Sequence, residues 1–461
     1  MRAIQEPSHN VPVVGEFDVV VLGGGPGGLP AAIAAARCGA KTILIERYGF
    51  LGGLATAGLI GPILGHRVSK EPRAAIGGIP EELCRRMADL GGAPPWEDAI
   101  QEWGVRFDVE ILKLVADAMA QEAGVRLVLH TLGASVAMAD GDIEAVIVES
   151  KSGRQAVAGK AFVDGTGDAD LAHWAGAATT KGRPADGRPM AMGTIFRVAG
   201  VKDAPRDAVA AARDRIRAAI ESGELYMYNP GTGGKGSTMQ AAEVTCNVAR
   251  AAGDATSVED LTAAELKIRR ETHDIVRFYR ENVPGMEDCY LSATPTTIGP
   301  RETRQAVGLA TLTGDDVVKG AKSPEAVARC GYWIDIHCPL GRVQNQTHLC
   351  SVKCPNDPPC IMFEEAHRAG LPDELYPPDG DWFDIPYGSL VSRDVGNLLT
   401  SGRCISADHH AMAALRVMGT CMAIGQAAGT AAALAADAGA RAADVPIDKL
   451  RETLTADGQL C

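Results

Sequence analysis

The stretch that most constrains the fold of this chain is residues 18–28, which read DVVVLGGGPGG. The apolar, β-branched run Val19–Leu22 predicts a short, buried parallel strand. Gly23, Gly25 and Gly28 follow on the spacing G-x-G-x-x-G. In that motif the glycines allow a tight turn, close approach of the backbone to a pyrophosphate, and close packing of the next helix. The stretch therefore predicts the first part of a dinucleotide-binding unit.

The residues after the glycines continue the same pattern. Residues 27–38 are expected to form a helix whose free N–H groups point at the phosphates. Lys41–Ile45 reads as a second strand that ends on Glu46, where an acidic residue usually binds the ribose hydroxyls of a dinucleotide. A glycine-rich turn is the alternative for the glycines alone. Strand, glycines, helix, strand and acid in register favour the nucleotide site.

Charge and composition narrow the class of protein. The chain has 461 residues, enough for two or three domains. Its net charge of −13 argues against nucleic acid or an anionic membrane as the main partner, but it says little about a small substrate, whose local field can differ from the global one. We expect a small-molecule substrate and leave homo-oligomerisation open. Residues 1–15 lack the apolar core of a signal peptide, and the uncharged run 417–436 suits a buried helix better than a membrane span. Twelve cysteines without an export signal are expected to be reduced, which favours the cytoplasm.

Two further segments have sequences that are typical of a ligand-binding site. Residues 47–66 contain a glycine every few positions and almost no charge, which favours backbone laid against a flat ligand over a mobile surface loop. Phe162–Asp164 reads as another short strand and leads into Gly165-Thr166-Gly167-Asp168. Asp168 could bind ribityl or ribose hydroxyls, or it could cap a helix that begins near residue 169.

Residues 181–384 differ in sequence pattern from both ends of the chain, and we expect them to be a domain inserted into the nucleotide-binding domain. Charged helical runs occur at 204–221 and 259–282, and no second G-x-G-x-x-G is present. We expect an α/β fold, with a Rossmann-like nucleotide-binding domain of parallel sheet and β-hairpin or meander, plus an inserted α+β substrate domain. The expected boundaries are 14–180 and 385–440 for the binding domain, 181–384 for the insert and 441–461 for a C-terminal tail.

Residues 337–360 hold a group of metal-ligand side chains. They are His337, Cys338, His348, Cys350, Cys354 and Cys360. The gaps between the cysteines differ from the C-x2-C pairs of common metal sites, so reduced thiols are favoured over a zinc or iron–sulfur centre. No metal ligand is assigned.

Taken together, these motifs resemble FAD-dependent oxidoreductases of the two-dinucleotide type, near the succinate dehydrogenase/fumarate reductase flavoprotein branch. The resemblance rests on Gly23–Gly28 with Glu46, Tyr48–Gly58, Asp164–Asp170, Arg301–Arg304 and the stretches 402–407 and 416–421. It covers both ends of the chain and only isolated motifs in the middle. The histidine that precedes the Gly-Gly pair in members with histidyl-linked flavin is absent here, which argues against that attachment.

The resemblance implies an extended FAD, with its adenosine at Glu46 and its pyrophosphate over the glycines. The residues expected to bind it are Gly23, Gly25, Pro26, Gly27, Gly28, Glu46, Arg47, Gly52, Gly53, Ala55, Thr56, Asp164, Gly165, Thr166, Gly167, Asp168, Gly402, Arg403, Thr420 and Cys421. The helix over 419–437 would direct its N-terminus at the pyrimidine edge of the flavin.

Candidate catalytic residues lie between or beside these motifs. His409 and His410 are the first choice for acid–base work, with hydrogen-bonded packing as the alternative. Arg301, Arg304 and Arg416 are candidates to hold a substrate anion or stabilise negative charge.

Cys421, at the expected start of a helix, could have a lowered pKa. The first domain has no C-x-x-C or C-x4-C pair, which disfavours a disulfide reductase.

The predicted function is hydride transfer between FAD and a small polar metabolite, such as a hydroxy acid or a sugar, with an unidentified electron acceptor or donor. Two alternatives stay open. One is an electron-transfer subunit with a metal or iron–sulfur cluster at residues 338–360. The other is a non-catalytic binding module that FAD stabilises.

Overall fold

The computed structural model describes residues 4, 10–184, 186–234, 237–339 and 375–461. Its strands are β1 (Val13–Leu22), β2 (Thr42–Ile45), β3 (Arg126–Val128), β4 (Leu132–Ala139), β5 (Asp142–Ser150), β6 (Gly153–Asp164), β7 (Thr179–Lys181), β8 (Met192–Ala199), β9 (Glu243–Ala251), β10 (Tyr290–Ala293), β11 (Arg304–Ala306), β12 (Ala326–Cys330), β13 (Phe383–Pro386) and β14 (Leu398–Thr400). Its helices are α1 (Gly28–Arg37), α2 (Ile79–Asp89), α3 (Trp96–Ala99), α4 (Val109–Glu122), α5 (Asp170–Trp174), α6 (Arg206–Ser222), α7 (Val258–Asn282), α8 (Gly314–Lys319), α10 (His409–Leu415), α11 (Met418–Ala438) and α12 (Ile447–Ala456).

The central sheet has the order β3-β2-β1-β6-β5-β4, with β14 paired to the end of β6. β3, β2, β1, β6 and β14 run parallel, whereas β4, β5 and β6 form an antiparallel meander. The mixed α/β class, the parallel sheet and the meander are thus confirmed. The predicted short strand at 162–164 is the end of the longer strand β6, which pairs with β1 in the parallel part of the sheet and with β5 in the meander.

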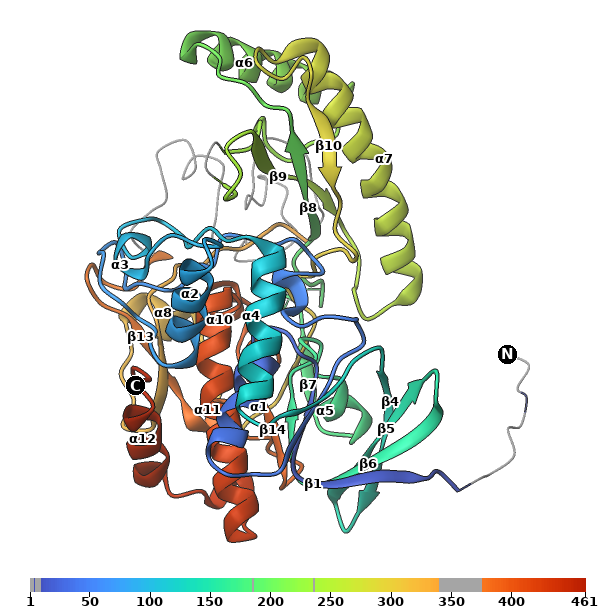
Figure 1. Ribbon diagram of the computed structural model, residues 1–461, viewed down its shortest axis with the longest axis vertical. Coiled ribbons are helices and arrows are strands. Elements are labelled where there is room, and N and C mark those ends of the chain that lie inside the picture. Colours follow the sequence, from blue (N-terminus) through green and yellow to red (C-terminus); the bar gives the residue numbers. More distant parts are fainter. Residues whose placement is uncertain (1–3, 5–9, 185, 235–236, 340–374) are drawn as a thin grey trace.

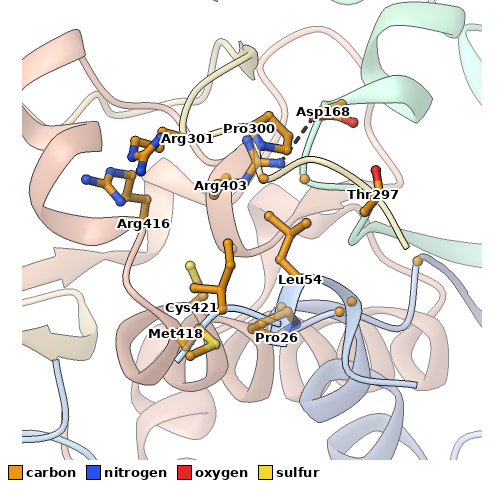
Figure 2. Close-up of a pocket in the computed structure, with 18 of the residues that line it drawn as sticks. Pro26, Leu54, Asp168, Thr297, Pro300, Arg301, Arg403, Arg416, Met418 and Cys421 are labelled. Atoms are coloured by element: carbon orange, nitrogen blue, oxygen red, sulfur yellow. Dashed lines mark hydrogen bonds and ion pairs between the residues drawn. The ribbon is translucent and has the colours of Figure 1, made fainter. Parts of the chain in front are cut away.

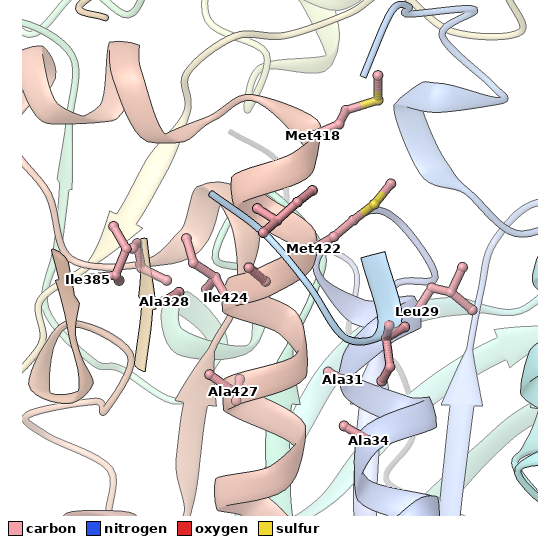
Figure 3. Close-up of a cluster of buried hydrophobic side chains, with 14 of the residues drawn as sticks. Leu29, Ala31, Ala34, Ala328, Ile385, Met418, Met422, Ile424 and Ala427 are labelled. Carbon is pink, nitrogen blue, oxygen red and sulfur yellow. The ribbon is translucent and has the colours of Figure 1, made fainter. Parts of the chain in front are cut away.

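Helices α1 and α11 lie side by side against the parallel part of the sheet (Figure 1). A Cβ on Gly425 would lie 2.0 Å from the carbonyl oxygen of Gly27, and one on Gly429 would lie 1.9 Å from that of Ala31. The two backbones therefore approach more closely than any larger side chain would allow. Figure 3 shows the apolar side chains of both helices in the buried cluster around this contact.

The segment that projects at the top of Figure 1 contains β8, β9 and β10 with helices α6 and α7. Its three strands form an antiparallel sheet in the order β10-β8-β9. Its buried side chains make a separate apolar cluster, from Met192 to Ile298. Ser257 caps α7, because its side chain accepts a hydrogen bond from the backbone N–H of Asp260.

The buried clusters divide the chain differently from the sequence-based boundaries. Leu312, Val317 and Ile334, expected in the insert, pack in the same core as β1 and α11. The second cluster ends at Ile298, so only about the first half of 181–384 belongs to it. The stretch expected to be a tail forms α12, whose Leu450 and Leu454 are fully buried in the main core. The assignment of these parts as independent domains stays a prediction.

Among the described residues, no single helix is both long and apolar enough to cross a membrane. Helices α10 and α11 together reach that length and hydropathy, but they meet at an angle of 96°.

Candidate active site and cofactor cavity

A cavity of about 660 Å³ opens at the carboxyl ends of β1, β2, β6 and β14, the edge at which parallel α/β sheets bind ligands. Its other walls come from the loop after η1 (Gly53–Ala55), from β8 and β9, from the segment before β11 and from the start of α11. Residues from both ends and the middle of the chain therefore meet in one cavity, as is expected from the sequence.

The glycine loop after β1 presents bare backbone to this cavity. Gly23 has a φ of +96°, which favours glycine. A Cβ on Gly28 would lie 1.8 Å from the carbonyl oxygen of Gly23, so α1 can begin here only with a glycine. Gly53 also has positive φ, and its Cβ would lie 2.6 Å from the Cα of Gly25. Two glycine-rich loops thus stack and leave room for a pyrophosphate beside α1.

Glu46 follows β2 and lines the same end of the cavity. Its Oε2 accepts a hydrogen bond of 2.7 Å from the Gly24 N–H, and its Oε1 accepts one of 2.9 Å from the Tyr48 N–H. Burial raises the pKa of this carboxyl, opposed by those backbone donors. Each oxygen retains lone-pair capacity, so Glu46 fits the role of ribose acceptor at the adenosine end of a dinucleotide.

A group of carboxylates follows β6. Asp164 Oδ1 accepts a hydrogen bond of 2.6 Å from the Thr166 hydroxyl and shapes the turn, while Asp168 pairs with Arg403 at 3.2 Å. Burial, and then the charges of Asp164 and Asp168, raise the pKa of Asp170 to about 7, although Arg304 opposes them. Asp168, Asp170 and Arg403 line the cavity, so they can meet the hydroxyls of a bound cofactor. Asp168 does not cap α5, because Ala169 holds the N-cap position.

The structure brings most of the expected cofactor residues to the cavity. Those that line it are Gly23, Gly25, Pro26, Gly27, Glu46, Arg47, Gly53, Gly165, Thr166, Gly167, Asp168, Gly402, Arg403 and Cys421. The expected residues that lie behind the lining are Gly28, Gly52, Ala55, Thr56, Asp164 and Thr420. The latter hold the loops: Thr56 donates to the Leu51 carbonyl, and Thr420 donates to the Cys330 thiol.

The opposite part of the cavity carries two of the expected arginines (Figure 2). Arg301 lies before β11 and donates to the Ala191 carbonyl at 2.7 Å. Arg416, between α10 and α11, donates to the carboxylate of Asp335 at 3.0 Å. The Nε of Arg416 has no hydrogen-bond partner among the described residues. Figure 2 shows the two guanidinium groups next to each other on one side of the cavity.

Positive charge is concentrated around Arg301 and Arg416. Burial, followed by the charges of Arg250 and Arg416, lowers the pKa of Arg301 well below its usual value. Asp335 is the carboxylate whose charge acts in the opposite direction. Among the described residues, Arg250, Arg301 and Arg416 bring three guanidinium groups here against the carboxylate of Asp335, so this part of the cavity favours an anionic ligand.

Of the histidines in the part of the chain that the structure describes, His337 lines the cavity, together with Asp335. Its Nε2 lies 3.3 Å from Asp335 Oδ2, and its ring meets that of Tyr228 edge-on at 6.3 Å. Burial lowers the pKa of His337 well below its usual value, and Arg301 lowers it further. The ring is therefore neutral at neutral pH and can accept a proton.

The other expected catalytic residues lie elsewhere. His409 and His410 are not among the described residues that line the cavity. His409 is 3% exposed, and its Nδ1 lies 2.8 Å from the buried carboxylate of Glu302. This geometry agrees with hydrogen-bonded packing, the alternative to an acid–base role. Arg304 pairs with Asp170 and with the Asp168 carbonyl, behind the cofactor end, and is not free to hold a substrate.

The expected low pKa of Cys421 is wrong. The thiol lines the cavity near the start of α11, but it is 4% exposed, and burial raises its pKa to about 12. Desolvation of the thiolate thus outweighs the helix N-terminus.

We therefore expect Cys421 to resist alkylation by iodoacetamide at pH 8, because almost none of it is thiolate. Peptide mass spectrometry after timed labelling of the folded protein measures this, with Cys38, which is partly exposed, as the internal comparison. Labelling of Cys421 ahead of Cys38 would contradict the raised pKa.

The cysteine group of the sequence analysis is only partly described. Cys338 is buried, whereas His348, Cys350, Cys354 and Cys360 lie outside the described residues. In the described ranges, no group of three or more His, Cys, Asp or Glu side chains is arranged to hold a metal. The alternative of a cluster at residues 338–360 stays a prediction.

Comparison with known proteins matches the family described as FAD dependent oxidoreductase to residues 18–454, almost the whole chain. Curated relatives match over shorter stretches. Dihydrolipoyl dehydrogenase of Trypanosoma brucei brucei is 57% identical over 42 residues, 9% of either chain. The tRNA uridine 5-carboxymethylaminomethyl modification enzyme MnmG of Aquifex aeolicus is 43% identical over 96 residues, 21% of this chain and 13% of the relative.

Solved structures are similar over more of the chain but at low identity. A geranylgeranyl bacteriochlorophyll reductase-like protein from Thermoplasma acidophilum is 13% identical, with a TM-score of 0.42, over 96% of this chain and 83% of the other. The curated relatives above are matched over about a tenth of their own lengths.

Proposed function

The chain belongs to the FAD dependent oxidoreductase family, and on this premise we propose that its substrate is a small hydroxy acid rather than a sugar. The observation that supports the proposal is the convergence of Arg301 and Arg416 on the cavity, with Arg250 behind them. A carboxylate offers the charge and the paired oxygens that guanidinium groups bind, whereas a neutral sugar would leave them uncompensated.

The cofactor fits the residues present. The glycine loops leave space for the pyrophosphate, Glu46 can accept from the ribose, and Asp168, Asp170 and Arg403 can meet the hydroxyls of the ribityl chain. When bound, FAD supplies the two-electron acceptor for a hydride.

The chain's own residues then bind and deprotonate the substrate. Arg301 and Arg416 hold its carboxylate and fix the orientation of the hydroxyl-bearing carbon. Oxidation breaks one C–H and one O–H bond of that carbinol and forms a carbonyl. The hydride leaves the carbon, and His337, neutral because its pKa is lowered, accepts the hydroxyl proton. Asp335, hydrogen-bonded to Arg416, lies at 3.3 Å from the ring and favours the protonated form that results.

The test is anaerobic titration of the FAD-loaded protein with hydroxy acids of increasing length, with the amide of each acid and with aldoses. We expect the acids to bleach the flavin and the amides and aldoses to leave it oxidised. Equal bleaching by an acid and its amide, or bleaching by aldoses alone, would overturn the proposal.

Replacing Arg416 by glutamine provides a residue-level prediction. The Arg416→Gln variant is expected to raise KM for the acid by about 100-fold, because one charge-assisted contact is lost and a neutral amide replaces it. Steady-state kinetics of the acid measures the effect. A KM within twofold of wild type would remove Arg416 from the substrate site.

A further inference from the structure

We propose that Arg250, a residue of the inserted segment that does not line the cavity, is the positioning residue that makes the substrate site selective for anions. This inference rests on the proposed function, because it assumes that the ligand beside Arg301 carries a negative charge.

Arg250 is a buried cation with incomplete hydrogen bonding. It lies on β9 and is 4% exposed. Its Nη1 donates to Asn247 Oδ1 and to the Ala249 carbonyl, both at 2.8 Å. Its Nε and Nη2 have no hydrogen-bond partner among the described residues. Among the described residues no carboxylate forms an ion pair with Arg250, and burial of an unpaired guanidinium is unfavourable unless an anion compensates its charge.

The guanidinium is held directly behind the cavity wall. Its Cζ lies 3.7 Å from the centre of the Tyr228 ring, and that ring lines the cavity beside His337. This contact fixes the position of the charge, because a cation packs favourably on the face of an aromatic ring. Asn247, which lines the cavity as well, holds the other edge of the guanidinium.

Gly193 lies between the guanidinium groups of Arg250 and Arg301. A Cβ at Gly193 would lie 2.7 Å from Nη1 of Arg250 and 2.8 Å from Nη1 of Arg301. The two charges therefore approach each other across a glycine that carries no side chain, although they repel. Burial and then the charge of Arg250 lower the pKa of Arg301, whereas burial and the charge of Arg416 lower the pKa of Arg250. Arg250 thus adds positive potential at the point where Arg301 meets the ligand, and this potential acts on an anion but not on a neutral isostere.

The experiment measures binding rather than turnover, with oxalate and its neutral diamide, oxamide, as probes. Dissociation constants come from the perturbation of the oxidised flavin spectrum, or from calorimetry. In wild type, oxalate is expected to bind more tightly than oxamide. In Arg250→Met this preference is expected to fall by about 10- to 100-fold, with the oxamide affinity unchanged. A merely structural role would weaken both probes alike.

Two further variants test whether the position of the Arg250 charge, rather than the loss of any arginine from the insert, sets the preference for oxalate. Gly193→Ala keeps both arginines, and its clash is with the ends of flexible side chains, so it is expected to fold and to lower the oxalate preference by about tenfold. Arg197→Met removes another arginine of the insert, on β8 and paired with Glu243 at 3.5 Å, and is expected to keep the wild-type preference.

The outcomes distinguish the inference from its premise. If oxalate binds wild type no better than oxamide does, the proposed anionic substrate fails. If wild type prefers oxalate, and Arg250→Met and Gly193→Ala keep the same preference for oxalate over oxamide as wild type, the proposed role of Arg250 is wrong and the proposed function stands.

Discussion

Replacing His337 by asparagine is expected to lower kcat of the FAD-loaded protein by about 10²- to 10⁴-fold, because asparagine cannot accept the hydroxyl proton. His337 lies beside Asp335 and near Arg301, and it is not among the residues expected to bind FAD, so the variant should retain its FAD. The rate of anaerobic flavin reduction in stopped flow, together with the flavin-to-protein ratio, measures both expectations.

The matched control is His273→Asn, which makes the same change at an exposed position on α7. It should retain wild-type reduction rates. If both variants reduce the flavin at the wild-type rate with FAD bound, His337 is not the base.

The pH dependence follows from the charges around the ring. Arg301 and Arg250 face His337 and lower its pKa, as burial does, whereas Asp335 raises it, and the sum lies well below the usual value. A lowered pKa keeps the basic form at lower pH. The acid limb of kcat/KM should therefore lie below pH 6.5, the ordinary histidine value, and be absent in His337→Asn.

The contrast between His337 and His409 shows what the sequence could predict. His409 and His410 lie between two cofactor motifs along the chain, and this position alone favours them as acid–base candidates. The Asp408 side chain caps α10 there, and His409 meets Glu302 in the interior. The relevant signal lay in residues 333–337, where Ile334 and Ile336 are fully buried and Trp333, Asp335 and His337 line the cavity. That alternation was readable, but only the fold shows which face meets a ligand.

The nucleotide-binding half was predictable for a different reason. Its glycines, its acid and its strands act within one βαβ unit, so their spacing in sequence fixes their spacing in the structure. The arginine end combines Arg250, Arg301 and Arg416 from three distant segments. The sequence does not predict a role for Arg250, because no motif near it in the chain indicates a binding site. Its neighbours Tyr228 and Gly193 come to it only through the packing of the insert.

The second large effect is expected at the contact between α1 and α11. Gly425→Ala places a methyl group 2.0 Å from the backbone carbonyl oxygen of Gly27, at a contact between two helices whose neighbouring side chains are buried in the main core. Such overpacking costs about 1–3 kcal/mol, more than the roughly 1 kcal/mol that alanine gains over glycine inside a helix. Gly425→Val should be worse.

The damage should reach the cofactor, because Gly27 and the start of α11 both line the cavity, so relief of the clash by movement of either one changes the cofactor site. We therefore expect Gly425→Ala to lose most of its FAD on purification and to unfold at a lower temperature, and Gly425→Val to yield little folded protein. Calorimetry and the flavin-to-protein ratio measure this. Gly234→Ala, at an exposed glycine where the nearest contact of a Cβ is 3.8 Å, is the matched control and should behave as wild type. If Gly425→Ala kept full FAD occupancy and wild-type stability, the close packing of the two helices would not be what forms the cofactor loop.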